Sequence, residues 1–213
     1  MIQLAGTGLL ADDLYLLAHD DVSGRPFLQP RALGLGLAGG LLAELVLAGR
    51  VRVVPDVAVA DRALPRDELA CNVVGLLLGE RDQHEVGDWL AYLSRSAAEG
   101  VALRLAGSGY LVRSPGRRWR REGRWVPSDS DCAFAPMIRV RAVLDAARQP
   151  AASDVVLAGL AVGCGLGSRV LPLGPPGARS QLEAAVRQLG PDLRGLIAQV
   201  QAGVDSAVLA QRM

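Results

Sequence analysis

Apolar residues recur at helical spacing along most of the chain. Between residues 8 and 18, Leu10, Leu14 and Leu17 fall on one face of a helix. The stretch 30–49 is almost entirely apolar, which predicts a long helix that is buried on most of its sides. Further helical segments are expected at 64–80, 86–98, 100–105, 135–147, 152–170, 178–189 and 191–210.

Two segments have the character of strands. Valine is frequent in 51–60, which predicts a short strand pair in the N-terminal half of the chain. Around 110–127, an apolar Tyr110–Val112 segment is followed by two turn signals, which predicts a protruding β-hairpin. We therefore expect a mainly α fold, a single multi-helical domain over residues 1–213 that carries this hairpin.

The composition excludes several classes of function. Half of the 213 residues are hydrophobic, which is enough for a sizeable core. The net charge is +1, so any affinity for nucleic acid or acidic lipid must come from a local patch. All 23 basic residues are arginine, which excludes lysine Schiff-base chemistry and a Walker-type phosphate loop. An arginine-only composition rich in alanine, glycine and leucine also favours a GC-rich, bacterial genome as its source.

Candidate catalytic and metal-binding residues are scarce. The three cysteines form no CxxC pair and are expected to be buried, and the two histidines lack a neighbouring ligand. Asp12 and Asp13 are adjacent on a helix and are not expected to face one site. Glu44 lies in the buried helix, where pairing with an arginine is favoured over catalysis. We expect no metal, no cofactor and no enzymatic activity.

The glycines Gly34, Gly36 and Gly39 match the GxGxxG pattern of dinucleotide-binding proteins. That site requires a strand directly before the glycines, whereas the preceding segment contains two prolines. Close packing between helices is therefore the favoured interpretation.

Neither of the two most apolar stretches reaches the length of a membrane-spanning helix. Such a helix needs about 20 apolar residues, and the stretches 33–49 and 155–168 are shorter. The N-terminus has no basic region before its apolar part, so it does not resemble a secretion signal. We expect a cytoplasmic protein with both stretches in its core.

The predicted hairpin concentrates the positive charge of the chain. From Arg113 to Arg124, both included, there are six arginines, and Trp119 and Trp125 are interleaved with them. Guanidinium groups bind phosphate with two parallel hydrogen bonds, and indole rings settle at the headgroup level of a bilayer. The candidate membrane-facing residues are Arg117, Arg118, Trp119, Arg120, Arg121, Arg124 and Trp125.

Other roles for the hairpin stay open at this point. It could be a solvated wing whose tryptophans fold back on the core, or a surface for a protein partner. A helix, a strand and a basic wing also outline a winged-helix nucleic-acid binder. The helix that would read bases offers only Arg104 and Ser108 as polar side chains, so nucleic acid is the weaker alternative.

Several blocks of sequence together resemble the Golgi phosphoprotein 3 family. They are TGLLADDLYLLAHDDVSGRP near the N-terminus, LAGGLLAELVLAGRV, VALRLAGSGYLV before the hairpin, and SDVVLAGLAVGCGLGSRVL near the C-terminus. They follow the order of the family over nearly the whole chain. The resemblance implies a mostly α-helical fold with a protruding hairpin. In eukaryotes it implies a peripheral membrane protein that binds phosphatidylinositol 4-phosphate.

The family's lipid-binding residues carry over only in part. The family uses an arginine in its second helix, where this chain has Ala38. Of two family arginines three residues apart, the first corresponds to Arg95 and the second to Ala98. Phe27 stands nearest to the family's tryptophan, and Arg31 is expected to face the bilayer. The headgroup candidates are thus Arg95, Phe27 and Arg31, and the family's 4-phosphate pocket is not expected to be intact.

These observations favour a non-enzymatic, cytoplasmic protein that attaches peripherally to membranes by binding anionic phospholipid headgroups. The alternative is a regulatory or adaptor protein whose hairpin mediates self-association or binds a protein partner. The second alternative is a winged-helix-like nucleic-acid binder.

Overall fold

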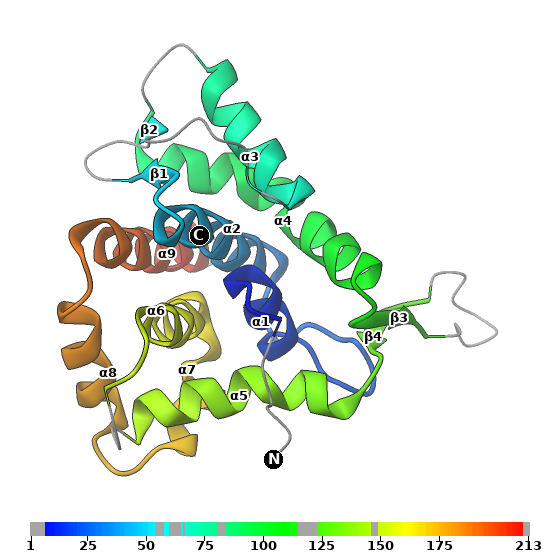
Figure 1. The fold of residues 1–213 in the computed structure, drawn as a ribbon. Coiled ribbons are helices and arrows are strands. Elements are labelled where there is room, and N and C mark those ends of the chain that lie inside the picture. Colours follow the sequence, from blue (N-terminus) through cyan, green and yellow to red (C-terminus); the bar gives the residue numbers. More distant parts are fainter. Residues whose placement is uncertain are drawn as a thin grey trace.

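The structure is a computed structural model that describes residues 7–53, 58–59, 65, 67–80, 84–114, 123–145 and 149–210. The prediction of a mainly α-helical protein is confirmed (Figure 1). The helices are α1 (Leu10–Leu17), α2 (Pro30–Leu47), α3 (Glu68–Gly79), α4 (Val86–Gly107), α5 (Ser130–Leu144), α6 (Ala152–Ala161), α7 (Gly167–Val170), α8 (Ala178–Arg187) and α9 (Pro191–Ala210). A π-helical turn at Val162–Leu166 joins α6 to α7, and a 3-10 turn at Leu171–Leu173 follows α7.

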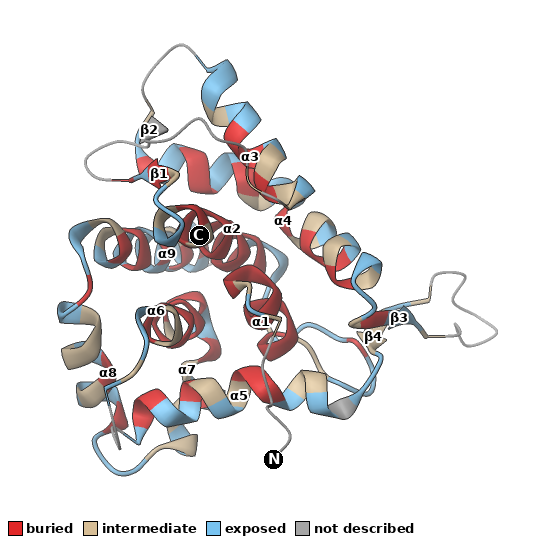
Figure 2. Ribbon diagram, in the orientation of Figure 1, coloured by how far each residue is buried: buried red, intermediate tan, exposed pale blue. Residues whose placement is uncertain are grey.

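Helix α2 lies in the middle of the core, as its apolar sequence predicts. Helices α1, α4, α6 and α9 all contact it, and nearly all of its residues from Ala32 to Leu45 are buried (Figure 2). Burial on this scale contributes about 25 cal/mol per Å² of apolar surface removed from water. The core is therefore organised around this helix.

The three glycines of the GxGxxG pattern permit close helix contacts. A Cβ atom at Gly34 would lie 2.4 Å from the Ser94 carbonyl oxygen of α4. At Gly36 a Cβ atom would lie 2.9 Å from Cys164 Cβ, and at Gly39 it would lie 2.6 Å from a Val200 methyl group. Such distances are too short for any side chain, so the packing interpretation of this pattern is confirmed.

Both predicted strand pairs are present. Strands β1 (Val51–Arg52) and β2 (Ala58–Val59) pair antiparallel in the N-terminal half. Strands β3 (Leu111–Arg113) and β4 (Trp125–Pro127) form the antiparallel base of the hairpin, at the edge of the helical body (Figure 1). The hairpin follows α4 directly, so the end of that helix fixes its position.

Helix α4 is continuous where the sequence predicted two segments. Gly100 lies in the middle of the helix without ending it. A Cβ atom there would lie 2.9 Å from Leu69 Cδ1, so the glycine allows a leucine of the α3 segment to approach α4. The predicted break before residue 100 was wrong because this glycine serves packing and not a turn.

Helix α5 begins at Ser130, earlier than the predicted residue 135. The Asp129 side chain accepts a hydrogen bond from the Asp131 backbone N–H over 3.1 Å and caps the helix. The Pro136 ring lies inside the helix without ending it. The apolar pattern alone therefore misplaced this boundary, which the polar capping residue sets.

Two helical stretches are long and apolar enough to cross a membrane by length and composition. They are Pro30–Leu47, of which 72% is buried, and the continuous stretch Ala152–Leu173, in which 56% of the most apolar 18 residues are buried. The expectation that neither stretch reaches the length of a spanning helix was therefore wrong. The second stretch is longer than its apolar residues suggested, because helix continues through the π-helical turn to Leu173. Residues Val155–Ala161 of the second stretch and most of the first are buried, which agrees with their predicted place in the core.

The cysteines are all free, and their burial differs. Cys164 is buried in the core, and burial raises the pKa of its thiol to about 12. Cys71 and Cys132 are only partly buried, so the expectation of full burial was wrong for these two.

Candidate functional site

The base of the hairpin pairs a basic and an aromatic residue. Arg113 and Trp125 lie opposite each other across β3 and β4. The Arg113 guanidinium carbon is 4.8 Å from the centre of the indole ring, which is a cation–π contact. Trp125 is half-buried against the core, whereas Arg124 is exposed. The indole therefore supports the hairpin from the protein side, and the adjacent guanidinium faces solvent.

A tight loop between α1 and α2 packs against this base. Its Gly24 has φ +62°, and a Cβ atom there would lie 2.1 Å from the Trp125 carbonyl oxygen. The loop is closed by a hydrogen bond from the Asp20 N–H to the Arg25 carbonyl oxygen over 2.8 Å. Its tip carries Val22, which is 82% exposed. The fold thus presents this tip beside the hairpin.

Together the loop and the hairpin enclose a hollow of about 430 Å³. Two guanidinium groups and an indole lie around it, a set suited to an anionic group on an amphipathic molecule. The lining residues are Tyr15, Gly24, Arg113, Gly123, Arg124 and Trp125. Sequence reasoning selected Arg124 and Trp125 for this face but not Arg113, whose role depends on the strand register.

Phe27 lies at a neighbouring cavity of about 220 Å³ between the loop, α5 and α7. The Arg169 guanidinium carbon is 3.4 Å from the centre of its ring, a contact that the sequence did not indicate. Phe134 lines the same cavity and is 50% exposed. We call the surface formed by Arg113, Arg124 and Trp125 the hairpin face. Phe27, Phe134 and Arg169 extend it toward α5.

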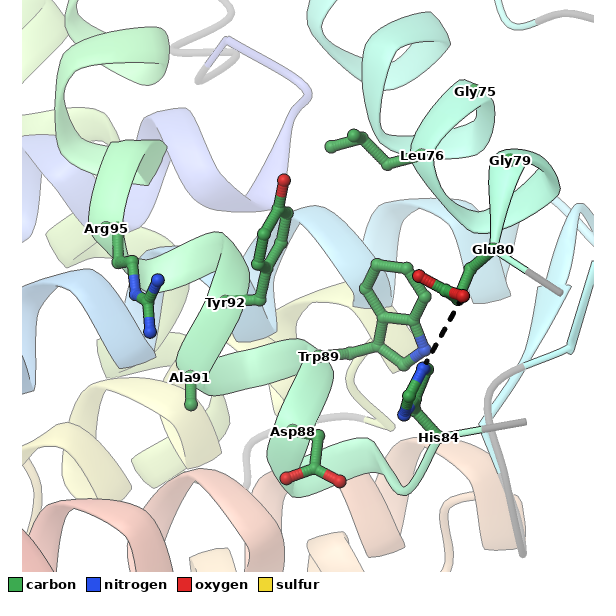
Figure 3. A pocket seen from close by; sticks show the side chains of 10 residues that line it. All are labelled: Gly75, Leu76, Gly79, Glu80, His84, Asp88, Trp89, Ala91, Tyr92 and Arg95. Atoms are coloured by element: carbon green, nitrogen blue, oxygen red, sulfur yellow. Dashed lines mark ion pairs between the residues drawn. The ribbon is translucent and has the colours of Figure 1, made fainter. Parts of the chain in front are cut away.

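The other two headgroup candidates lie elsewhere. Arg95 lines a separate cavity of about 580 Å³ beside α3 and α4, together with Trp89 and Tyr92 (Figure 3). Arg31 is exposed on the first turn of α2. Ala38, where the family has an arginine, is fully buried in the core. Arg95 and Phe27 thus line different cavities in this chain.

Most of the arginine-rich tip of the hairpin lies outside the described residues. The membrane-facing candidates concerned are Arg117, Arg118, Trp119, Arg120 and Arg121. Their role stays a prediction from the sequence.

Arg104 holds a buried group of carboxylates together. Its guanidinium nitrogens lie 2.8 Å from Asp12 Oδ1, 3.1 Å from Glu44 Oε2 and 2.8 Å from Asp67 Oδ2. Glu44 also accepts a hydrogen bond from the Ala11 N–H over 2.7 Å. The expected pairing of Glu44 with an arginine is confirmed, and this arginine links α1, α2 and the start of α3 to α4.

Burial outweighs the arginine in setting the acidities of this group. Desolvation raises the pKa of Asp12 to about 7 and also raises that of Glu44, although Arg104 opposes both shifts. Burial alone would lower the pKa of Arg104, but Glu44, Asp12 and Asp67 more than offset it and raise that pKa. Burial therefore makes the Asp12 and Glu44 carboxyl groups weaker acids than they are in water, although both face the Arg104 guanidinium.

Asp13 belongs to a different ion-pair group. It pairs with Arg139 of α5, whose Nε also donates to Asp154 Oδ1 over 2.7 Å. Burial raises the pKa of Asp13, against the lowering effect of Arg139 and of the Thr7 hydrogen bonds. The expectation that Asp12 and Asp13 face different sites is therefore confirmed. Both ion-pair groups join helices to one another. Within the described part of the chain, no cluster of three His, Cys, Asp or Glu residues could hold a metal.

The comparisons with known proteins agree with this architecture. The model of the family described as Golgi phosphoprotein 3 (GPP34) matches residues 10–209, from the first residue of α1 almost to the end of α9. No curated protein matches the sequence. Because the family model covers nearly the whole chain, the protein belongs to the Golgi phosphoprotein 3 family.

Proposed function

We propose that the protein is a non-enzymatic peripheral membrane protein that binds anionic phospholipid headgroups through its hairpin face. The observation that carries the proposal is the hollow at the hairpin base, where Arg113 and Arg124 flank Trp125. Guanidinium groups supply the phosphate contacts, and Trp125, packed against the core, holds Arg113 at this face through the cation–π contact.

The neighbouring loop supports the same orientation toward a bilayer. Val22 at its tip is almost fully exposed, and Phe27 and Phe134 are partly exposed beside it. Exposed apolar side chains rimmed by basic ones are typical of surfaces that contact membranes. Such binding needs no inositol-specific pocket, which fits the alanines at positions 38 and 98.

The nucleic-acid alternative loses its main polar side chain. Arg104 is one of only two candidates on the helix before the hairpin, and its side chain is 7% exposed within the buried ion-pair group. A guanidinium held by three carboxylates is not free to contact base edges. The alternative is that the hairpin binds a protein partner. Measuring vesicle binding distinguishes this alternative from the proposal.

The test is co-sedimentation with vesicles that contain phosphatidylglycerol. Each basic side chain near an anionic surface contributes about 1 kcal/mol, so Arg113→Ser/Arg124→Ser should weaken binding about 30-fold. Replacing Arg117, Arg118, Arg120 and Arg121 with Ser should abolish it while the fold stays intact. The matched control is Arg179→Ser/Arg187→Ser on α8, exposed and at the opposite side of the molecule (Figure 1).

The control should sediment like wild type. Unchanged sedimentation of both hairpin variants would contradict the proposal. Absence of wild-type binding to any vesicle would favour a protein partner instead.

A further inference from the structure

The cavity beside α3 and α4 has features of a binding site that the hairpin face does not use. Its volume is about 580 Å³, within the range typical of small-molecule sites. It lies along the first half of α4, whereas the hairpin follows the other end of that helix (Figures 1 and 3). Its lining includes Asp88, Trp89, Tyr92 and Arg95 of α4 and Gly79 and Glu80 at the end of α3.

Two aromatic rings form a corner in this cavity. The ring centres of Trp89 and Tyr92 are 6.0 Å apart, and their planes meet at 86°. On the other side of the indole, the His84 ring lies 6.0 Å away with an angle of 82°. Trp89 is 8% exposed and is therefore fixed by packing, whereas Tyr92 is 50% exposed and accessible. The two rings meet edge to face, and both line the cavity. An ammonium group is attracted to the face of an indole or phenol ring within about 6 Å of its centre.

The charges around the corner are arranged along the cavity. The carboxylates of Glu80 and Asp88 line it, and Glu80 Oε1 lies 3.9 Å from His84 Nε2. Arg95 lies seven residues after Asp88, about 10 Å along the helix axis. Figure 3 shows Glu80 and His84 on one side of Trp89 and Arg95 beyond Tyr92 on the other. The end that holds the indole is thus the acidic end.

Two glycines of α3 leave space in the cavity. A Cβ atom at Gly75 or Gly79 would meet no atom within 4 Å. Gly75 lies inside the helix, where glycine is among the poorest helix formers, and it serves no close contact with another element. Larger side chains at these positions would occupy space beside the aromatic corner.

We propose that this cavity binds the ammonium group of a small organic cation, with the cation in the corner of Trp89 and Tyr92 and the Glu80 carboxylate opposing its charge. A quaternary ammonium group matches the site because its methyl groups contact the rings and its charge interacts with their faces. The group could belong to a soluble compound or to a lipid headgroup. The inference does not depend on membrane binding by the hairpin.

The experiment uses Trp89 as a fluorescent reporter in the full-length chain. In the variant Trp119→Phe/Trp125→Phe, Trp89 is the single tryptophan. This variant is titrated with choline and, in parallel, with 3,3-dimethyl-1-butanol, which has the same shape and no charge. We expect a saturable change in fluorescence with choline and an affinity at least 10-fold weaker for the alcohol.

Variants at Tyr92 distinguish the attraction of the aromatic face from simple apolar contact. Tyr92→Phe keeps the aromatic face and should bind choline like the parent, whereas Tyr92→Leu should bind it about 3- to 5-fold more weakly. Glu80→Gln should also weaken binding. Gly79→Leu should fill the cavity and abolish binding, and its control, Gly107→Leu at an exposed position of α4, should not change it.

Vesicles of phosphatidylcholine identify the source of the ammonium group. Binding to these vesicles that Tyr92→Leu weakens, without binding of free choline, would support the site and assign it to a lipid headgroup. Equal affinities for choline and its neutral analogue, or a Tyr92→Leu variant that binds like the parent, would overturn the proposal. So would the lack of saturable binding to both choline and phosphatidylcholine vesicles.

Discussion

Arg104 pairs with the buried carboxylates of Asp12 and Glu44 and with the partly exposed carboxylate of Asp67. Its side chain is 7% exposed, and Asp12 and Glu44 are similarly buried. The substitution Arg104→Met keeps much of the apolar volume of the side chain and removes its charge and its hydrogen-bond donors. It is therefore the most direct perturbation of the contact that joins α1, α2 and α3 to α4.

The expected cost is large because the carboxylates lose their partner without gaining water. Removing one member of a buried ion pair typically costs about 3–5 kcal/mol. The total free energy of unfolding of a domain is about 5–15 kcal/mol, so this change removes a substantial part of it. Protonation relieves some of the cost, since Asp12 has a pKa of about 7 even with Arg104 present. The loss should therefore be smaller at pH 5 than at pH 8.

Urea unfolding followed by circular dichroism at 222 nm measures the effect. The matched control is Arg141→Met on α5, which removes an arginine that is 64% exposed and lies 3.5 Å from Asp145. Exposed pairs contribute about 0–1 kcal/mol, so the control should change the free energy of unfolding by that amount at most.

A second variant keeps the reasoning testable if Arg104→Met does not fold. Asp67→Ala removes one charge from the group and the side-chain cap of α3, and should lower the free energy of unfolding by about 1–2 kcal/mol. A loss below about 1 kcal/mol for Arg104→Met at pH 8, or a loss equal to that of Arg141→Met, would refute the structural role given to this group.

Three further perturbations follow from particular contacts. Burial raises the pKa of Asp12 from 3.8 to about 7, so the folded protein holds the carboxyl proton more tightly than the unfolded chain does. The stabilisation from this proton is complete below pH 4 and is lost as the pH rises through 7. In urea unfolding, the wild type should therefore lose stability relative to Asp12→Asn between pH 4 and 7, by at most about 1.4 kcal/mol per pH unit. If the free energies of unfolding of the two proteins change in parallel with pH, the raised pKa of Asp12 is contradicted. Gly24→Ala should cost about 1–3 kcal/mol, because its φ is +62° and its Cβ would meet the Trp125 carbonyl; an unchanged melting temperature would speak against that contact. Gly34→Ala should cost about 1–3 kcal/mol by separating α2 from α4, and Gly107→Ala, where a Cβ atom meets open space, should not.

Much of the fold follows from the sequence because the apolar residues recur with a clear helical period. The central position of α2 could be predicted from its nearly uninterrupted apolar composition. The boundaries that were wrong depend on features outside that period. Gly100 suggested the end of a helix, but the leucine packed against it decides its role, and Asp129 extends α5 through a side-chain cap.

The sequence predicted several of the residues of the candidate site but not which of them contact one another. The number and spacing of the hairpin arginines mark a basic segment, and the pairing of Glu44 with an arginine follows from the cost of burying a lone charge. The contacts of Arg113 with Trp125 and of Arg169 with Phe27 depend on strand register and on the meeting of distant segments. The spacing of residues along the sequence does not predict these two contacts.

The measurement that tests the central claim most directly is co-sedimentation of the wild-type protein with four kinds of vesicle at two salt concentrations. The vesicles contain neutral lipid alone, or neutral lipid with phosphatidylglycerol, cardiolipin or phosphatidylinositol 4-phosphate. The account predicts binding to all three anionic compositions, weakened by salt because guanidinium–phosphate attraction is screened. Absence of binding to every anionic vesicle would contradict the membrane role. A strong preference for the phosphoinositide would contradict the charge-based binding that the hairpin face is proposed to provide.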